Sequence, residues 1–469
     1  MIEDVLRVHR DRFERCVAEL ADFCRIPSVG GDDAGMDAAV AWLVRVMREA
    51  GIEVNVLPGE GNHPYVVGVA RGAGERTLLF LNHYDIANYT NPVPQHVKPG
   101  ERHPFSGAVE GDRIYARGVA DDKATLLSRI QATRTWREAR GELPITVKFL
   151  FEGKRGLATN GLERFLAGHF PLVRADACCW EAGSKDEADR PVITLGHKGQ
   201  LYVELVCRTA NADYPSRITA LPNAAWRLVW ALASIKGPDE RVRVPGFYDG
   251  VQPITEAART QFYARLPQDP GGLRERTGVR GFVKGLDGQD VMRFIYSEPV
   301  AAICGVAAGY TGPGHKLLMP GEARARVEFR LVPDQDSDRL LAALRVHLDA
   351  AGFDDIAVEV LASNPPYSIP AGDPLVRLVA DAARETYGVD PVVVPFATGI
   401  GPRYLFRRHT AMPIVGFAIG YASSALETSD EHIRVRDYDE GIRHVLAILA
   451  RAHTLPQVEE MAASSGGGG

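Results

Sequence analysis

The chain has 469 residues, a length that favours two domains over a single compact core. Its 60 acidic residues outnumber its 54 basic residues, and neither charge forms long runs, which argues against nucleic acid or an anionic membrane as a partner. No apolar run reaches the roughly 18 residues that a membrane span needs. The six cysteines include no CxxC pair, so we expect reduced cysteines and a cytoplasmic location.

The first 200 residues predict a mainly parallel sheet with helices on both of its faces. Two helical patterns come first, over residues 2–23 and 34–51. The apolar runs YVVGVA, TLLFL, ITVKFLF and DACCW follow, and the helical segment DDKATLLSRIQATRTWREAR separates the second run from the third. Short apolar runs with helices between them are typical of parallel strands buried on both faces.

The pattern changes near residue 200, where LYVELVCR and later ARARVEFRLV alternate with a period of two. With the helical segments LPNAAWRLVWALASI and SDRLLAALRVHLDAAG, they predict a smaller α+β domain. The α/β pattern returns after NPPYSIP. We therefore predict a discontinuous catalytic domain, residues 1–199 and 364–469, interrupted by an α+β lid of residues 200–363. The stretch SSGGGG, residues 464–469, is predicted to be a flexible tail.

Residue types that bind metals follow several of the predicted strands. His83 and Asp85 stand in LNHYDI directly after TLLFL, and Glu181 follows DACCW. Asp121 and Asp122 precede a predicted helix in GVADDKATLL. A capped turn or a helix N-cap explains any one of them. Together, metal-type ligands at one edge of one predicted sheet indicate a metal site, because chemistry in such sheets sits at the carboxyl ends of the strands.

Four segments carry a resemblance to a known family: LNHYDI, HPFSGAVEGDRIYARGVADDKA, GYTGPGHKLLMPGEARARVEFRLVPDQD and SDEHI. They occur in the order found in the dinuclear zinc metallopeptidases that include carnosinase, aminoacylase, succinyl-diaminopimelate desuccinylase and the glutamate carboxypeptidases. The resemblance implies that His83 binds a metal and that Asp85 orients it. It also implies that Asp121 is the carboxylate that bridges two zinc ions, that Glu181 is the second site's acidic ligand, and that the Asp121–Asp122 peptide bond is cis.

The chain departs from this family pattern in the segment FEGKRG. The family has two consecutive glutamates there, a general base and a ligand of the first metal, whereas this chain has Arg155 and Gly156. A guanidinium cannot accept a proton near neutral pH, and glycine has no ligand atom. The family's C-terminal histidine ligand, four residues before Glu431, is replaced by Glu427. Every one of these changes affects the first metal site and its base.

The changes leave a site whose charges cancel. The carboxylates of Asp121, Glu181 and Glu427 face one guanidinium and one divalent ion. We therefore predict at most one divalent ion per chain, held by His83, Asp121 and Glu181: zinc, with manganese or cobalt as alternatives. Arg155 is predicted to replace the first metal and to pair with Glu427 and Asp121. The alternative is random drift of an inactive pocket.

The resemblance also implies candidate substrate contacts. Arg330 matches a lid arginine that faces the cleft, although an ordinary surface ion pair is the alternative. Tyr214 in NADYPS aligns loosely with the lid histidine that polarises the scissile carbonyl. Gly399 in ATGIGP stands where the family has a glycine-rich substrate loop. Because lids in this family commonly pair across a two-fold axis, we expect a homodimer that forms through the helix LPNAAWRLVWALASI.

These inferences predict a metal-dependent amide hydrolase that acts on a small dipeptide or N-acyl amino acid-like substrate. The residues expected to carry or support the chemistry are Arg155, Glu427 and Asp85, with Glu427 as the candidate base. Two alternatives stay open. One is a non-hydrolytic acyl or amide chemistry, such as cyclisation or transfer in a biosynthetic pathway. The other is a catalytically inactive binding protein of the same fold.

Overall fold

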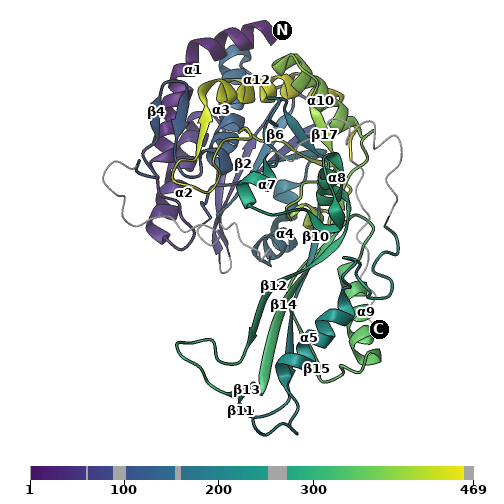
Figure 1. The fold of residues 1–469 in the computed structure, drawn as a ribbon. Helices are drawn as coiled ribbons and strands as arrows, with labels where there is room; N and C mark the ends of the chain where they lie inside the picture. The colour runs from purple at the N-terminus through teal and green to yellow at the C-terminus, as the bar shows by residue number, and fades with distance from the viewer. Residues whose placement is uncertain (1, 60–61, 88–101, 154–159, 252–271, 459–469) are drawn as a thin grey trace. The chain divides into compact units, whose positions relative to one another are not determined.

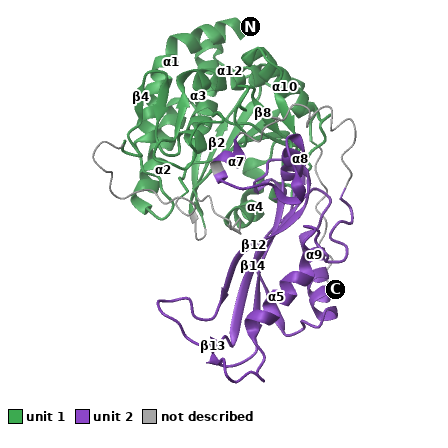
Figure 2. Ribbon diagram, in the orientation of Figure 1, with its two compact units in different colours: residues 1–196, 369–395, 405–469 green, residues 197–368, 396–404 purple. Residues whose placement is uncertain are grey.

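The computed structural model describes residues 2–59, 62–87, 102–153, 160–251 and 272–458 (Figure 1). The chain divides into two compact units (Figure 2). Unit 1 comprises residues 1–196, 369–395 and 405–469, and unit 2 comprises residues 197–368 and 396–404. The domain boundaries expected at residues 199/200 and 363/364 stay a prediction.

Unit 1 is built on an eight-stranded mixed sheet (Figure 1). Its strands are, in spatial order, β1 (Glu53–Gly59), β2 (Asn62–Ala70), β6 (Thr146–Glu152), β3 (Thr77–His83), β7 (Ala177–Trp180), β18 (Ile414–Gly416), β8 (Val192–Thr194) and β17 (Val392–Val394). The central strands β6, β3, β7 and β18 run parallel, while β1, β2 and β6 pair antiparallel. All residues of β3 after Thr77 are buried, as expected for a strand covered on both faces. This confirms the predicted mainly parallel α/β architecture.

Helices cover both faces of this sheet, as the side chains of β2 show. Tyr65 of β2 packs on Phe165 of helix α4 (Asn160–Val173), with ring centroids 4.3 Å apart. Gly68 faces Met47 of helix α2 (Asp33–Glu49). Residues 65 and 68 point to opposite faces of a strand. Helices α2 and α4 therefore lie on opposite sides of the sheet.

The other helices of unit 1 pack mostly on one another. Helix α3 (Ala124–Arg140) contacts α1 (Ile2–Cys24) and α12 (Val435–Arg451), and α12 also contacts α10 (Pro374–Tyr387). A short π-helical turn, η1 (Val119–Lys123), leads directly into α3, and η4 (Ala452–Thr454) follows α12. A small sheet joins β19 (His432–Arg434), β5 (Arg113–Tyr115) and β4 (Ala108–Glu110).

Unit 2 contains a four-stranded antiparallel sheet with two helices packed on it. The strands are, in spatial order, β12 (Val300–Ala308), β14 (Glu322–Leu331), β10 (Gly199–Arg208) and β15 (Ile356–Asn364). Helices α5 (Ala224–Ile235) and α9 (Ser337–Ala350) pack on the face that carries alternate apolar residues of β10 and β14. Asn223 begins α5 by accepting hydrogen bonds from two backbone N–H groups of its first turn. The alternation of apolar and polar residues in LYVELVCR and ARARVEFRLV had predicted an α+β domain, and the structure confirms it.

Several short elements complete the description. They are β9 (Gly196–His197), β11 (Tyr214–Pro215), α7 (Leu273–Thr277), η3 (Val283–Gly285), α8 (Gln289–Ser297), β13 (Leu318–Met319), β16 (Tyr367–Ser368) and α11 (Arg403–Arg407). In the part of the chain that the structure describes, no helix is both long and apolar enough to span a lipid bilayer.

Candidate metal centre

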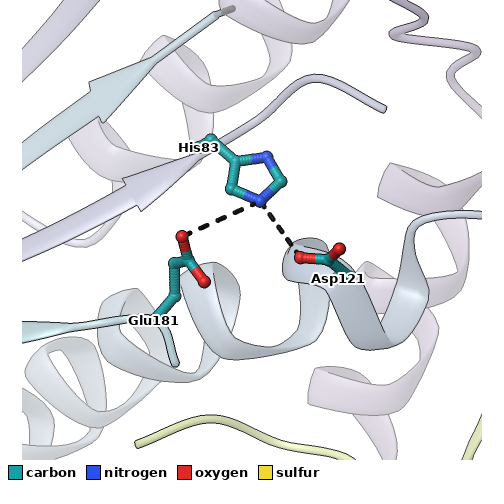
Figure 3. Close-up of side chains that lie close together, drawn as sticks. All are labelled: His83, Asp121 and Glu181. Carbon is teal, nitrogen blue, oxygen red and sulfur yellow. Dashed lines mark hydrogen bonds and ion pairs between the residues drawn. The ribbon is translucent and has the colours of Figure 1, made fainter. Parts of the chain in front are cut away.

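Three side chains from separate parts of the sequence converge at the carboxyl edge of the unit 1 sheet (Figure 3). His83 is the last residue of β3, Glu181 directly follows β7, and Asp121 lies in η1. Because β3 and β7 are parallel neighbours, both strands end at the same edge. The structure thus brings together the three residues that were predicted as metal ligands.

The spacing of their donor atoms suits one divalent ion. The Nε2 atom of His83 lies 3.2 Å from Oδ1 of Asp121 and 4.0 Å from Oε1 of Glu181. Zinc binds imidazole nitrogen and carboxylate oxygen at about 2.0–2.2 Å, so two donors on one ion are at most about 4.4 Å apart. One ligand atom from each of the three residues lies within 4.8 Å of the others. The three side chains therefore fit a zinc-sized ion with small rotations.

The ring of His83 is held with Nε2 directed at the two carboxylates. Its Nδ1 lies 3.0 Å from the backbone oxygen of Asp85 and 3.5 Å from the Asp85 carboxylate. The nearer partner is the carbonyl, which can only accept, so Nδ1–H donates to it and Nε2 is the ring nitrogen directed at Asp121. The orienting role predicted for the Asp85 side chain stays a prediction. The backbone carbonyl of Asp85 also orients the His83 ring, through its hydrogen bond with Nδ1.

The turn that carries Asp121 is held by Glu431, a residue to which the sequence assigned no role. The carboxylate of Glu431 accepts hydrogen bonds from the backbone N–H groups of Ala120 at 3.0 Å and Asp121 at 3.3 Å. Its second oxygen accepts from the N–H of Glu427 at 3.2 Å. Burial raises the pKa of Glu431 to about 7, although hydrogen bonds from the backbone of Gly118, Ala120 and Glu427 oppose the shift. One carboxyl group thus holds the backbone of both a candidate metal ligand and the candidate base.

The backbone at this turn is unusual at two positions. The Asp121–Asp122 peptide bond is cis, as the family resemblance implied. Glu427 adopts a left-handed conformation with φ of 62°, which costs a non-glycine residue roughly 1–2 kcal/mol. The hydrogen bond from its N–H to Glu431 helps to hold this conformation.

A further acid, Glu152, lies beside the site. It ends β6 in register with His83 on the neighbouring parallel strand. Burial raises the pKa of Glu152 to about 8, the charges of Asp85 and Glu181 raise it further, and His83 opposes them. Glu152 directly follows the run ITVKFLF in the sequence and was not predicted as a site residue. Its position at the end of a buried strand was the available signal.

One predicted site residue, Arg155, lies outside the described part of the chain. Arg155 and its neighbour Gly156 fall in the segment 154–159, so the pairing of Arg155 with Glu427 and Asp121 stays a prediction. Among the described residues, the group that could hold a metal consists of His83, Asp121 and Glu181.

The predicted substrate contacts all belong to unit 2. Arg330 on β14 forms an ion pair with Glu328, with 3.0 Å between Nη2 and Oε1, which is the alternative considered for it above. Tyr214 lies in β11 and pairs with Met319. Gly399 lies in the segment 396–404. A role in substrate binding stays a prediction for all three.

The fold and the site together indicate the class of protein to which the chain belongs. A mainly parallel α/β unit with a histidine and a carboxylate at two strand ends and a second carboxylate in a helical turn beside them, joined to an α+β unit, is the architecture of a two-domain metallopeptidase. The model for "Peptidase family M20/M25/M40" matches residues 79–451, and the chain belongs to this family. One structural neighbour, the YXEP protein of Bacillus subtilis, is a dinuclear metal-binding peptidase of the same family; it superposes with a TM-score of 0.57 at 13% identity, covering 95% of this chain and 99% of that one.

Individual relatives agree with this assignment. The chain is 24% identical over 373 residues to "Beta-Ala-His dipeptidase" of Rattus norvegicus, which covers 76% of this chain and 74% of the relative. It is 22% identical over 392 residues to "Cys-Gly metallodipeptidase dug1" of Schizosaccharomyces pombe, which covers 81% of each. The crystal structure of the M20 metallo-carboxypeptidase Sso-CP2 from Sulfolobus solfataricus superposes with a TM-score of 0.83 at 29% identity, covering 94% of this chain and 99% of that one.

Proposed function

We propose that the protein is a metal-dependent hydrolase of small peptide-like amides, of the size of a dipeptide or an N-acyl amino acid. The observation that carries this proposal is the convergence of His83, Asp121 and Glu181 at the edge of the sheet in a chain of this peptidase family. The curated relatives add support, since those named above are dipeptidases.

The residues of the site would divide the work as follows. His83, Asp121 and Glu181 would hold the ion, which when bound would polarise the scissile carbonyl or make bound water more acidic. Glu427 is the candidate base that would take a proton from the attacking water. Glu431 holds Glu427 and Asp121 by their backbone N–H groups, so it would keep base and ligand in a constant relation.

The proposal includes an altered first metal site with at most one ion per chain. It rests on the sequence, where Arg155 and Gly156 replace the family's two glutamates and Glu427 replaces the histidine. Glu152 supports a site of low net negative charge, because a carboxyl with a pKa of about 8 is protonated near neutral pH. Zinc is the proposed ion, with manganese and cobalt as alternatives.

The replacement of the general base by Arg155 favours two other candidates. A site that lacks this base suits acyl or amide chemistry in which water must not attack, such as cyclisation or transfer. It also suits a protein that binds the ligand without converting it. Chemistry restricted to one pathway-specific substrate would support the first candidate, and binding without turnover would support the second.

A substrate panel tests the proposal. Metal-free protein is reloaded with zinc, manganese or cobalt and incubated with dipeptides, including β-Ala-His and Cys-Gly, and with N-acyl amino acids. We expect slow metal-dependent hydrolysis that is lost in His83→Ala and kept in His453→Ala, a control at an exposed histidine. Turnover that survives in His83→Ala, or no turnover with any ion, would overturn the hydrolase proposal.

A further inference from the structure

Arg129 is a fully buried cation that contacts the strands leading to His83 and Glu181. It stands on the second turn of α3 and is 0% exposed. Its guanidinium lies near the rings of Phe80 and Phe417, at 5.1 and 5.4 Å from their centroids. Burial lowers the pKa of Arg129, and the charge of Asp122 opposes this shift. A buried charge is costly to keep, so its partners show what it does there.

The guanidinium joins the carboxyl ends of three adjacent strands. Its Nη1 donates to the carbonyl oxygens of Leu81 on β3 at 3.0 Å and Cys179 on β7 at 3.1 Å. Its Nη2 donates to the carbonyl of Phe417, directly after β18, at 3.4 Å. The carbonyl of Leu81 also accepts the N–H of Glu181 at 3.3 Å. The Arg129 side chain thus bonds the backbone two residues before His83 and two residues before Glu181.

A second branch of the same network leads to the third ligand. Arg129 Nη1 also donates to the side-chain oxygen of Asn82, and Asn82 Nδ2 donates to the Asp122 carboxylate at 2.6 Å. Asn82 precedes His83 in the chain, and Asp122 follows Asp121. Asn82 and Asp122 are both buried. Apart from Phe417, every residue that the network bonds is therefore a chain neighbour, or next neighbour, of a metal-type ligand.

We propose that Arg129, acting through Asn82, Asp122 and the strand-end carbonyls, is a positioning residue that sets the relative placement of His83, Asp121 and Glu181. Arg129 makes none of its hydrogen bonds to these three side chains, so it does not act as a ligand. A single planar group with several N–H donors can bond three strands and an amide at once, which a lysine ammonium with three donors on a flexible stem cannot reproduce. The inference rests on the proposed metal site.

The test compares two arginines of the same helix. Arg134 also lies on α3 and is nearly buried, but it pairs with Glu19 and Glu138 instead of the strand ends. The variants Arg129→Lys and Arg134→Lys keep the charge and change only the geometry of the donors. For each protein the metal-free form is prepared, its thermal unfolding midpoint is measured, and its affinities for zinc and cobalt are determined by competition with a chelator. The visible absorption of the cobalt form reports the ligand geometry.

We expect Arg129→Lys to bind both metals about 10–100-fold more weakly, as is typical when a partner outside the ligand set is lost, and to change the cobalt spectrum. Arg134→Lys should keep wild-type affinity and spectrum, even if its unfolding midpoint falls. Arg129→Lys with affinity within about twofold of wild type, or equal losses in both variants, would overturn the inference.

A second variant covers the case in which Arg129→Lys does not fold. Asn82→Ser removes the amide between Arg129 and Asp122 and leaves the strand-end bonds in place. The inference predicts weaker metal binding and a changed cobalt spectrum for this variant, and unchanged binding would contradict it. Wild-type protein that binds neither ion would refute the metal site itself, an outcome distinct from failure of the positioning role.

Discussion

At the scale of single residues, His83 shows how a metal-type histidine is prepared for one task. Its Nδ1–H donates to the backbone oxygen of Asp85, so Nε2 alone faces Asp121 and Glu181. The ring is only 2% exposed, and the hydrogen bond from Nδ1–H to the Asp85 carbonyl holds its orientation. Removing this ring should therefore remove the ion as well as one ligand.

The first prediction concerns the number of ions. Elemental analysis of the purified protein should find no more than one divalent ion per chain, and His83→Ala should contain none. The reason is that the two remaining carboxylates hold a divalent ion much less tightly than the complete triad. His453→Ala serves as the control and should keep the wild-type content. Two tightly held ions per chain would show that the first metal site is intact.

The stability of the folded protein at acid pH is predicted to depend on His444. His444 of α12 is fully buried, and burial lowers its pKa from the ordinary 6.5 to about 4, although its hydrogen bond with the Val379 carbonyl raises it. Between these two values the unfolded chain binds a proton that the folded protein does not. Stability should therefore fall as the pH drops from 6.5 to 4, by up to about 1.4 kcal/mol per pH unit from this residue.

The variant His444→Gln isolates this contribution. Glutamine does not titrate and its amide can still donate to the Val379 carbonyl, so the variant should lose about 3 kcal/mol less than wild type over the same interval. Urea unfolding at several pH values measures the difference. His453→Gln, at an exposed position, should follow the wild-type curve. Parallel curves for His444→Gln and wild type would contradict the prediction.

At the scale of elements, helix α5 of unit 2 presents an apolar outer face. Trp226, Val229 and Trp230 are 59%, 47% and 56% exposed, and the two tryptophan rings stack with centroids 5.9 Å apart. The opposite face of α5 packs on the unit 2 sheet through Leu228, Ala231 and Ile235. Large aromatic residues gathered on an exposed face are typical of protein interfaces.

We propose that α5 pairs with α5 of a second copy of this chain, as expected from the sequence. Light scattering at micromolar concentration should give twice the chain mass of 51.1 kDa. Trp230→Glu should weaken the dimer by about 30-fold or more, because loss of a central aromatic at an interface typically costs at least about 2 kcal/mol. Trp230→Phe keeps an apolar ring and should stay dimeric. A monomeric wild-type protein would refute the proposal.

At the scale of the whole molecule, the chain keeps the fold of the M20 family, and its sequence predicts an altered first metal site. The central strands β6, β3 and β7 still place Glu152, His83 and Glu181 at one edge. Because the framework is retained, substitution alone should restore the ligands that the family resemblance predicts to be missing.

The variant Arg155→Glu, Gly156→Glu, Glu427→His restores the ligands and base that the family resemblance implies. We expect it to bind a second divalent ion and to gain dipeptide hydrolysis, since a general base is worth roughly 10²–10⁴-fold in rate. Each single change should do little or cause harm, because residues that act as a unit are not additive. Arg155→Ala should reduce stability by more than loss of an ordinary surface charge. A harmless Arg155→Ala, together with a folded triple variant that binds no second ion, would indicate random drift.

The sequence by itself determined the positions of the ligands along the chain. His83 and Glu181 follow the apolar runs TLLFL and DACCW, and short apolar runs between helical patterns indicate buried strands. Asp121 directly precedes a helical pattern, which is also visible in the local sequence. Parallel order then placed the two strand ends at one edge, so the triad could be predicted without coordinates.

Only the tertiary structure decided which other groups support that triad. Glu431 reaches Asp121 from 310 residues away in the sequence, and Arg129 bonds Phe417 across 288 residues. The register of β3 and β6 places Glu152 beside His83. The path of the loop after β3 makes the Asp85 carbonyl, not its carboxylate, the nearer partner of His83 Nδ1. Local patterns record whether a segment is buried or helical. They do not record the strand register and helix packing that set contacts between distant segments, which is why these partners appeared only in the fold.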